Sequence, residues 1–520
     1  MTTWRLRLWL SGCLGIAMAM TEATEAGARG HHPGSGARHR KALELGEVAL
    51  PVKPRTLTLE TVVQSALESF PSLIAATKRK EMAAGEKLAA EGGFDTSLKL
   101  LSRSSVAGLY ENEMVDVGFE QPTPYWGATF FGGYRLGSGN FPVYEGKSQT
   151  ADSGEFRAGV SIPLWRNRSI DRRRATLAQA ELSQLIAHHD YDAQLLELQR
   201  VATQRYWDWV LAGRRLAAAR DLLNIAETRD AGLRARIVGG DLPAIDATDN
   251  QRVILERRER LVAAERLLEQ AAIQLSLYLR TPDGQPQLPQ PEDLPEGFPE
   301  PRMPHRMELH AMVDEALSRR PELKRLEQQR KNAEIDRDLA RNQRQPGVDL
   351  SLSGAQDLGV NPETQYYQIN RSEMYLGVSI DLPVQQRVAS GRIVSAEANL
   401  ERIQADSQLL GDRIAAEVKD ALSALKAALK RLEIAQRHRE TALQMEEGER
   451  SRYELGDSNL MFVNQRELAS GDAAILVADA FSSFHKSLAD YRYALGDLQA
   501  METKADKAQL KWTSRAPAKD

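Results

Sequence analysis

The chain contains two copies of one sequence unit, and this duplication constrains its fold more than any other feature. The stretch from Leu57 to Leu73 recurs from Met307 to Leu323, with an Ala-Leu pair and a proline at matching positions. Three more matches follow in the same order: 94–98 with 348–352, 159–164 with 377–382, and Gly240-Asp241 with Gly456-Asp457. Four matches in register predict two units of the same build: helix, strand, strand, very long helix, turn and helix.

Composition favours an extended, mainly helical protein. Of 520 residues, 6% are aromatic and 27% are charged, which suits long solvated helices better than compact domains. The net charge of -4 is too small to indicate a nucleic-acid partner. Cys13 is the only cysteine, so neither a disulfide framework nor a cysteine-based metal site is expected. No motif implies a cofactor.

The N-terminus reads as a signal peptide over residues 1–26. Arg5 and Arg7 form a short basic region, an apolar stretch runs from Leu8 to Met20, and small residues such as Ala26 offer cleavage sites. The segment Leu10–Cys13 also fits a bacterial lipobox, in which Cys13 would be lipidated; the alternative is a cysteine within an ordinary apolar core. Export from the cytoplasm is therefore expected.

The rest of the chain divides at changes of composition. Residues 281–305 are rich in proline and predict a linker between the two copies. The predicted organisation is a disordered lead-in (27–55), a first repeat (56–280), this linker, a second repeat (306–500) and a polar C-terminal tail (501–520).

One strand in each copy alternates strictly between apolar and polar residues, so one of its faces prefers an apolar medium. A half-buried strand of a soluble sandwich would show the same pattern. The export signal and the aromatic residues near the strands favour a membrane instead. The residues predicted to face lipid are Phe156, Val160, Ile162, Leu164, Met374, Leu376, Val378 and Ile380.

The segment between the paired strands is much longer in the first copy than in the second. It covers roughly 102–153 in the first copy and roughly 354–373 in the second. Glycines at 132, 133, 137 and 139 predict either an extra hairpin or a large outer loop. Without that hairpin, the count is two strand pairs per chain.

Two helices are expected to be unusually long, at about 166–237 and 384–455, where no proline interrupts the periodic pattern. About 72 residues at 1.5 Å each give roughly 108 Å of helix. A single apolar stripe runs from Leu410 to Leu432 in steps of three and four. Shorter helices are predicted at about 244–279, 309–344 and 458–499, and the first two together would match the length of one long helix.

With these repeats, the chain resembles the TolC-type outer-membrane efflux channel family over about 57–500. The resemblance implies a mainly α-helical fold with a small β part, in which three protomers form an α-helical barrel and share a 12-stranded β-barrel. It also implies a homotrimer in the outer membrane of a Gram-negative bacterium, in contact with lipid and extending into the periplasm. A periplasmic adaptor and an inner-membrane pump complete the exporter in that family.

The two glycine-centred turns correspond to the family's periplasmic tips, which meet the adaptor and constrict the tunnel. The residues so implied are Gly239, Gly240, Asp241, Asp246, Asp249, Tyr453, Leu455, Gly456, Asp457 and Ser458. The chain departs from the family at Ser458, where a gating arginine is usual, and at Phe462 and Gln465, which replace two aspartates. In the simpler interpretation, the glycines only permit left-handed helix ends and the aspartates cap the next helices.

Physical reasoning also favours assembly, because a sheet of few strands leaves open edges that are costly in lipid. An enzyme is the first rival class, but no Gly-x-Ser-x-Gly, HExxH or phosphate-loop motif is present. A non-channel periplasmic coiled-coil adaptor or scaffold is the alternative kept open. The exported cargo is not encoded in any motif of this chain.

Overall fold

The computed structural model describes residues 56–142, 149–240, 242–304, 308–360 and 372–498. These residues all belong to the unit Pro54–Asp520. The predicted signal peptide with Cys13, the lead-in 27–55 and the tail 501–520 lie outside the described residues.

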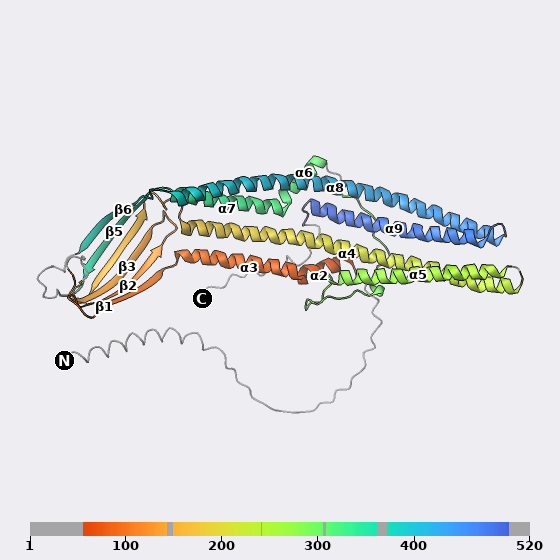
Figure 1. Ribbon diagram of the computed structural model, residues 1–520, viewed down its shortest axis with the longest axis horizontal. Coiled ribbons are helices and arrows are strands. Elements are labelled where there is room, and N and C mark those ends of the chain that lie inside the picture. Colours follow the sequence, from red (N-terminus) through yellow and green to blue (C-terminus); the bar gives the residue numbers. More distant parts are fainter. Residues whose placement is uncertain (1–55, 143–148, 241, 305–307, 361–371, 499–520) are drawn as a thin grey trace, which may run out of the picture. The chain divides into compact units, whose positions relative to one another are not determined.

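The described elements follow the same order in both halves of the unit, except that the first half has two additional strands, β2 and β3 (Figure 1). The first half contains α2 (Leu59–Ser69), α3 (Pro71–Glu91), β1 (Ser97–Ser105), β2 (Asn112–Pro122), β3 (Thr129–Gly139), β4 (Glu155–Pro163), α4 (Arg172–Val238) and α5 (Ala244–Ser276). The second half contains α6 (Leu309–Arg319), α7 (Pro321–Gln343), β5 (Gly347–Asp357), β6 (Glu373–Asp381), α8 (Arg387–Glu454) and α9 (Leu460–Ala494). None of these described helices combines the length and apolar character needed to cross a membrane.

The six strands form one antiparallel sheet in the order β1-β2-β3-β4-β5-β6 (Figure 1). The expected count of two strand pairs per chain is wrong, because the long segment after β1 contributes the extra hairpin β2–β3 to the same sheet. Part of the predicted outer segment, 143–148, lies outside the described residues. Three copies of this sheet would not give the 12 strands that the family resemblance implied.

The two long helices are present with nearly the predicted bounds. Helix α4 has 67 residues and α8 has 68, each roughly 100 Å at 1.5 Å per residue. Asp171 caps α4, where its side chain accepts a hydrogen bond from the Arg174 backbone N–H at 3.0 Å. The predicted stripe on α8 is confirmed, since Ile414, Val418 and Leu425 are fully buried.

Shorter helices lie beside each long one, as expected, but 244–279 shares α4 with α2 and α3 and is not continued by 309–344. Pro321 divides the second pattern into α6 and α7, because proline disfavours the helical conformation of the residue before it. Both α6 and α7 pack along α8, and α7 also touches α4. Helices α2 and α3 lie along α4 together with α5. Each long helix therefore runs beside shorter helices of its own repeat.

The proline-rich segment is packed against both repeats over the part that the structure describes. The Phe298 ring stacks between Trp207 of α4 and Phe481 of α9, with ring centroids 5.8 Å and 5.2 Å away. The Leu294 side chain lies directly over Gly213, where a Cβ would approach to 2.5 Å. Burial lowers the pKa of His485, whose ring stacks on Trp207 at 4.3 Å. This linker therefore fastens the first helical hairpin to the second.

Candidate functional site

One face of the sheet is apolar and exposed. The strand register places Val160 opposite Leu352 and Ile162 opposite Leu350, while Val378 pairs with Leu350 from the other side. Seven of the predicted lipid-facing residues thus share one face: Phe156, Val160, Ile162, Met374, Leu376, Val378 and Ile380. Leu164 follows the end of β4, and its N–H donates to the Val348 carbonyl at 2.7 Å. Met374 is 80% exposed and Val378 61%, unlike core side chains.

The same face continues over β1, β2, β3 and β5, for which no lipid-facing residues had been predicted. On β3, Tyr134 pairs with Phe156 and Phe130 pairs with Val160, so these side chains lie on the apolar face. The pairings of β3 with β2 and of β2 with β1 extend this face to the edge of the sheet. The added exposed apolar residues are Leu98, Leu100, Val117, Phe119, Phe130 and Leu352. The two-residue alternation in 115–119 was the available signal for Val117 and Phe119.

The opposite face of the sheet is polar and carries ion pairs. Asp116 on β2 accepts from Arg135 on β3 at 3.1 Å and also pairs with Arg157 on β4. Lys99 on β1 pairs with Glu120 on β2. Charges gathered on one side and apolar groups on the other make the sheet strongly two-faced, as a wall between an apolar medium and water requires.

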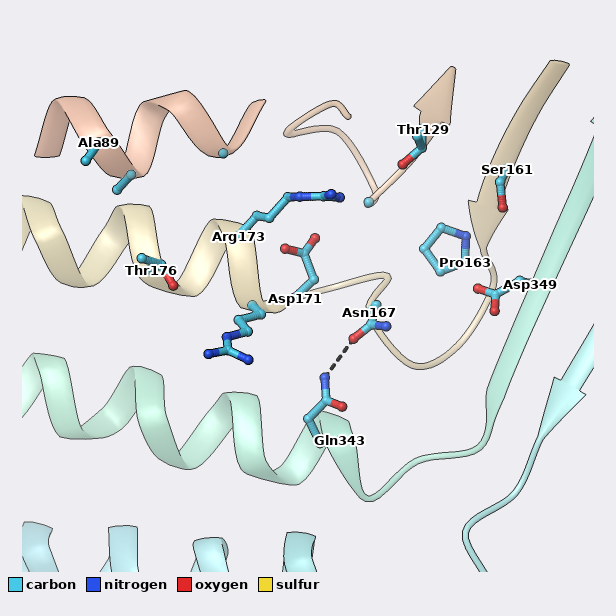
Figure 2. A pocket seen from close by; sticks show the side chains of 14 residues that line it. Ala89, Thr129, Ser161, Pro163, Asn167, Asp171, Arg173, Thr176, Gln343 and Asp349 are labelled. Atoms are coloured by element: carbon cyan, nitrogen blue, oxygen red, sulfur yellow. Dashed lines mark hydrogen bonds between the residues drawn. The ribbon is translucent and has the colours of Figure 1, made fainter. Parts of the chain in front are cut away.

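A cavity of about 730 Å³ lies where this polar face meets the long helices (Figure 2). Thr129, Ser161 and Asp349 line it from the strands, while Asp171 and Arg173 line it from the start of α4. The Gln343 amide donates to the Asn167 side-chain oxygen at 2.7 Å and ties the end of α7 to the turn before α4. This polar hollow is consistent with the water-facing side continuing from the sheet onto the helices.

The second turn is a left-handed helix end. Gly456 has φ +81°, its N–H donates to the Tyr453 carbonyl at 3.1 Å, and the Asp457 N–H donates to the Arg452 carbonyl at 2.9 Å. This pair of bonds satisfies carbonyls that would otherwise have no partner at the end of α8. Asp457 does not cap α9; the Asn459 side chain does, accepting from the Phe462 N–H at 3.1 Å.

The first turn has the same build. Gly239 ends α4, Gly240 has φ +82°, and the Gly240 N–H donates to the Ile237 carbonyl at 3.0 Å. Asp241 lies outside the described residues. Asp246 sits in the first turn of α5, where a carboxylate is favourable to the helix dipole, and Asp249 pairs with Arg252 at 3.1 Å.

The remaining predicted tip residues differ in exposure. Leu455 is 85% exposed, so an apolar side chain stands in solvent at the turn. Ser458 bonds to Glu449, a buried carboxylate on α8. Tyr453 is half-buried, and its hydroxyl is buried without a hydrogen-bond partner among the described residues. Among the described residues, therefore, none forms a latch with the Tyr453 hydroxyl.

A buried charge cluster, which was not predicted from the sequence, joins the two helical hairpins near their turns. Glu467 of α9 is 2% exposed and receives Arg257 of α5 at 2.8 Å and Arg229 of α4. The Arg229 guanidinium also donates to the Asn464 side chain. The available signal was Arg229 itself, a charge in the apolar stripe formed by Leu222, Ala226 and Leu233.

A second polar contact ties α4 to α5. The side chain of Asn250 on α5 is fully buried and donates to the Asp230 carboxylate of α4 at 3.1 Å. Arg234 donates to the same carboxylate at 2.6 Å. These bonds, led by the one from Arg234, lower the pKa of Asp230. Within the described part of the chain, no group of three or more His, Cys, Asp and Glu side chains could hold a metal ion.

Solved structures of outer membrane channels share this fold. The open state of the outer membrane channel MtrE of Neisseria gonorrhoeae superposes with a TM-score of 0.61 at 17% identity, covering 90% of this chain and 97% of that one. The CmeC outer membrane channel of Campylobacter jejuni superposes with a TM-score of 0.60 at 14% identity, covering 93% and 98%. No curated protein sequence matches the chain significantly.

The profile of the outer membrane efflux protein family matches residues 131–279 and 312–509, which is more than half of the chain. The first matched segment runs from β3 to just past α5, and the second begins in α6, covers the rest of the second half and ends beyond the described residues. This match and the shared fold confirm the predicted family and its outer-membrane location in Gram-negative bacteria. The chain belongs to the outer membrane efflux protein family.

Proposed function

We propose that this protein is the outer-membrane channel of a tripartite efflux or type I secretion system. In this proposal three copies form a passive conduit from the periplasm to the exterior, a periplasmic adaptor docks on it, and an inner-membrane pump supplies the energy. The protein itself carries out no chemistry. The observation that carries the proposal is the exposed apolar face of the sheet, joined directly to helices of roughly 100 Å.

The apolar face supports a location in lipid. Side chains such as Met374, Leu376 and Ile380 are each more than 70% exposed in the single chain, and they cover one continuous side of the sheet. In water such an apolar patch would promote aggregation, whereas contact with the hydrocarbon chains of lipids is favourable for it. The polar face, with Asp116 and Arg157, would then line a water-filled interior.

The turns support adaptor docking at the far ends of the helices. Val238, Ile245 and Leu455 are at least two-thirds exposed around the two turns, and they offer apolar contact area. Arg229 of α4 bonds to Asn464 and Glu467 of α9, so the two turns belong to neighbouring hairpins. A partner could therefore contact both at once.

We expect the detergent-extracted protein to be a homotrimer. The sheet has open edges at β1 and β6, and unsatisfied edge N–H and C=O groups cost several kcal/mol each in lipid. Native mass measurement in mild detergent tests this directly. A stable, folded monomer as the main species would contradict the proposed channel.

We expect Gly456→Trp to abolish export while leaving the trimer intact. A residue with a side chain is strained at φ +81°, but no atom lies within 4 Å of a Cβ built there, so the bulky ring would project into the proposed adaptor surface. The measurement is complementation of export, with trimer level and adaptor crosslinking followed in parallel.

The matched control is Gly391→Trp, which places the same ring in open space on the same helix, far from the turn. Export should survive in that variant. Normal export and adaptor crosslinking by Gly456→Trp would reject the turn as a docking site and leave it as a helix end only.

A further inference from the structure

The hairpin β2–β3 is built into the sheet. Its strands pair with β1 over nine residue pairs, from Ser97↔Glu120 to Ser105↔Asn112, and with β4 from Thr129↔Ser161 to Arg135↔Glu155. The two hairpin strands pair with each other along their full length. This hairpin therefore separates β1 from β4, which would otherwise be free to pair directly.

The two faces of the hairpin match those of its neighbours. Val117, Phe119 and Phe130 lie on the apolar face and are exposed, in line with Phe156 on β4. Asp116 lies on the polar face and bridges β2 to β3 and β4 through two arginines. A hairpin standing in water beyond the membrane would need no such apolar face.

The end of the hairpin nearest the helices, at the turn between β2 and β3, carries aromatic residues like those found at membrane interfaces. Tyr125 and Trp126, in the turn between β2 and β3, are 76% and 66% exposed, and Trp165 follows β4 at the same end of the sheet. The turn packs against the segment leading to α4, because a Cβ on Gly127 would lie 2.6 Å from the Asn167 carbonyl oxygen. Exposed aromatic residues at one level are typical of membrane–water boundaries.

The two edge strands, β1 and β6, run in directions that allow them to pair between neighbouring copies. Five successive antiparallel pairings make β1 and β6 run in opposite directions. If β6 of one copy lies beside β1 of the next, the pair is antiparallel and the alternation continues without a break. The apolar residues Leu100 on β1 and Leu376 on β6 would then remain on the same side of the joined sheet.

We propose that the β2–β3 hairpin is part of the membrane wall, so that three copies joined through β1 and β6 close a barrel of 18 strands, six from each copy. This inference rests on the trimer of the proposed function. Because barrel diameter grows roughly linearly with strand number, the outlet would be about one and a half times as wide as a 12-stranded one. Barrels of about 16–18 strands enclose an open aqueous channel, which suits bulky cargo.

Cysteine crosslinking in the full-length protein in membranes tests this strand order. Cys13 is the only native cysteine, so the background is low. Thr129→Cys with Ser161→Cys should link within one chain, because the two residues are paired on β3 and β4. Lys99→Cys with Arg157→Cys should not link, since the two residues lie level across the sheet but two strands and roughly 14 Å separate β1 from β4.

The edge contact is tested with Leu101→Cys and Ser379→Cys on the polar faces of β1 and β6. Within one chain these strands are roughly 24 Å apart, so any link must join two copies. A short thiol crosslinker, repeated with Lys99→Cys and Arg103→Cys, covers the unknown register, because diagonal neighbours lie roughly 7–8 Å apart. We expect covalent dimers and trimers on denaturing gels.

The outcomes separate this inference from the proposed function on which it rests. A β1–β4 link in place of the β3–β4 link, in a protein with trimer mass, would show that the hairpin leaves the wall; it would overturn the 18-stranded barrel and leave the channel standing. A monomer mass without β1–β6 links would overturn both.

Discussion

Val378→Arg is expected to prevent assembly in the outer membrane, whereas Ser379→Arg on the same strand is expected to be tolerated. Val378 is 61% exposed on the apolar face of β6, near the middle of the strand. A cation on the lipid face near the bilayer midplane costs about 2–4 kcal/mol per copy, and three copies would carry it. Ser379 points to the polar face, opposite Asp349 on β5, where a cation finds water and a carboxylate.

The measurement is the amount of folded, heat-modifiable oligomer in purified outer membranes, compared at equal expression. The two variants introduce the same side chain at neighbouring positions, so both chains should be synthesised and secreted equally well and only their assembly should differ. If Ser379→Arg failed and Val378→Arg assembled normally, the assignment of the two faces would be reversed.

Glu467→Ala is expected to destabilise the helical hairpins strongly. The Glu467 carboxylate is nearly inaccessible and binds two arginines, and Arg257 is itself only 4% exposed. Removing one partner of a buried ion pair leaves an uncompensated charge, which typically costs about 3–5 kcal/mol. The affected contacts join α4 and α5 to α9, so the damage should be greatest near the turns.

The control is Asp406→Ala, which breaks an exposed pair between Asp406 and Arg402 at 2.7 Å on α8. Exposed pairs of this kind contribute about 0–1 kcal/mol. Chemical denaturation of the detergent-solubilised protein, followed by circular dichroism, compares the two variants. Similar small shifts in the midpoint of both would show that the buried cluster contributes little to stability.

The two glycine-centred turns show which features can be predicted from short sequence patterns. A glycine followed by a polar residue, between two long periodic segments, predicts a left-handed helix end, and Gly240 and Gly456 both have positive φ. The role of Asp457 as a cap was wrong, because Asn459 lies one position before the helix and captures the free N–H. Choosing between nearby capping residues depends on the path of the turn, which short-range propensity does not specify.

The sequence by itself determined the duplication, the family, the two long helices and the two faces of β4 and β6. These features repeat every two or every 3.6 residues, so they are readable from neighbours along the chain. Only the tertiary structure decided which distant strands and side chains contact one another. Ser161 meets Ser351, and Arg229 meets Glu467, across about two hundred residues of chain or more. The six-stranded sheet, the packed linker and the buried charge cluster all depend on such distant pairings, which no local periodicity encodes.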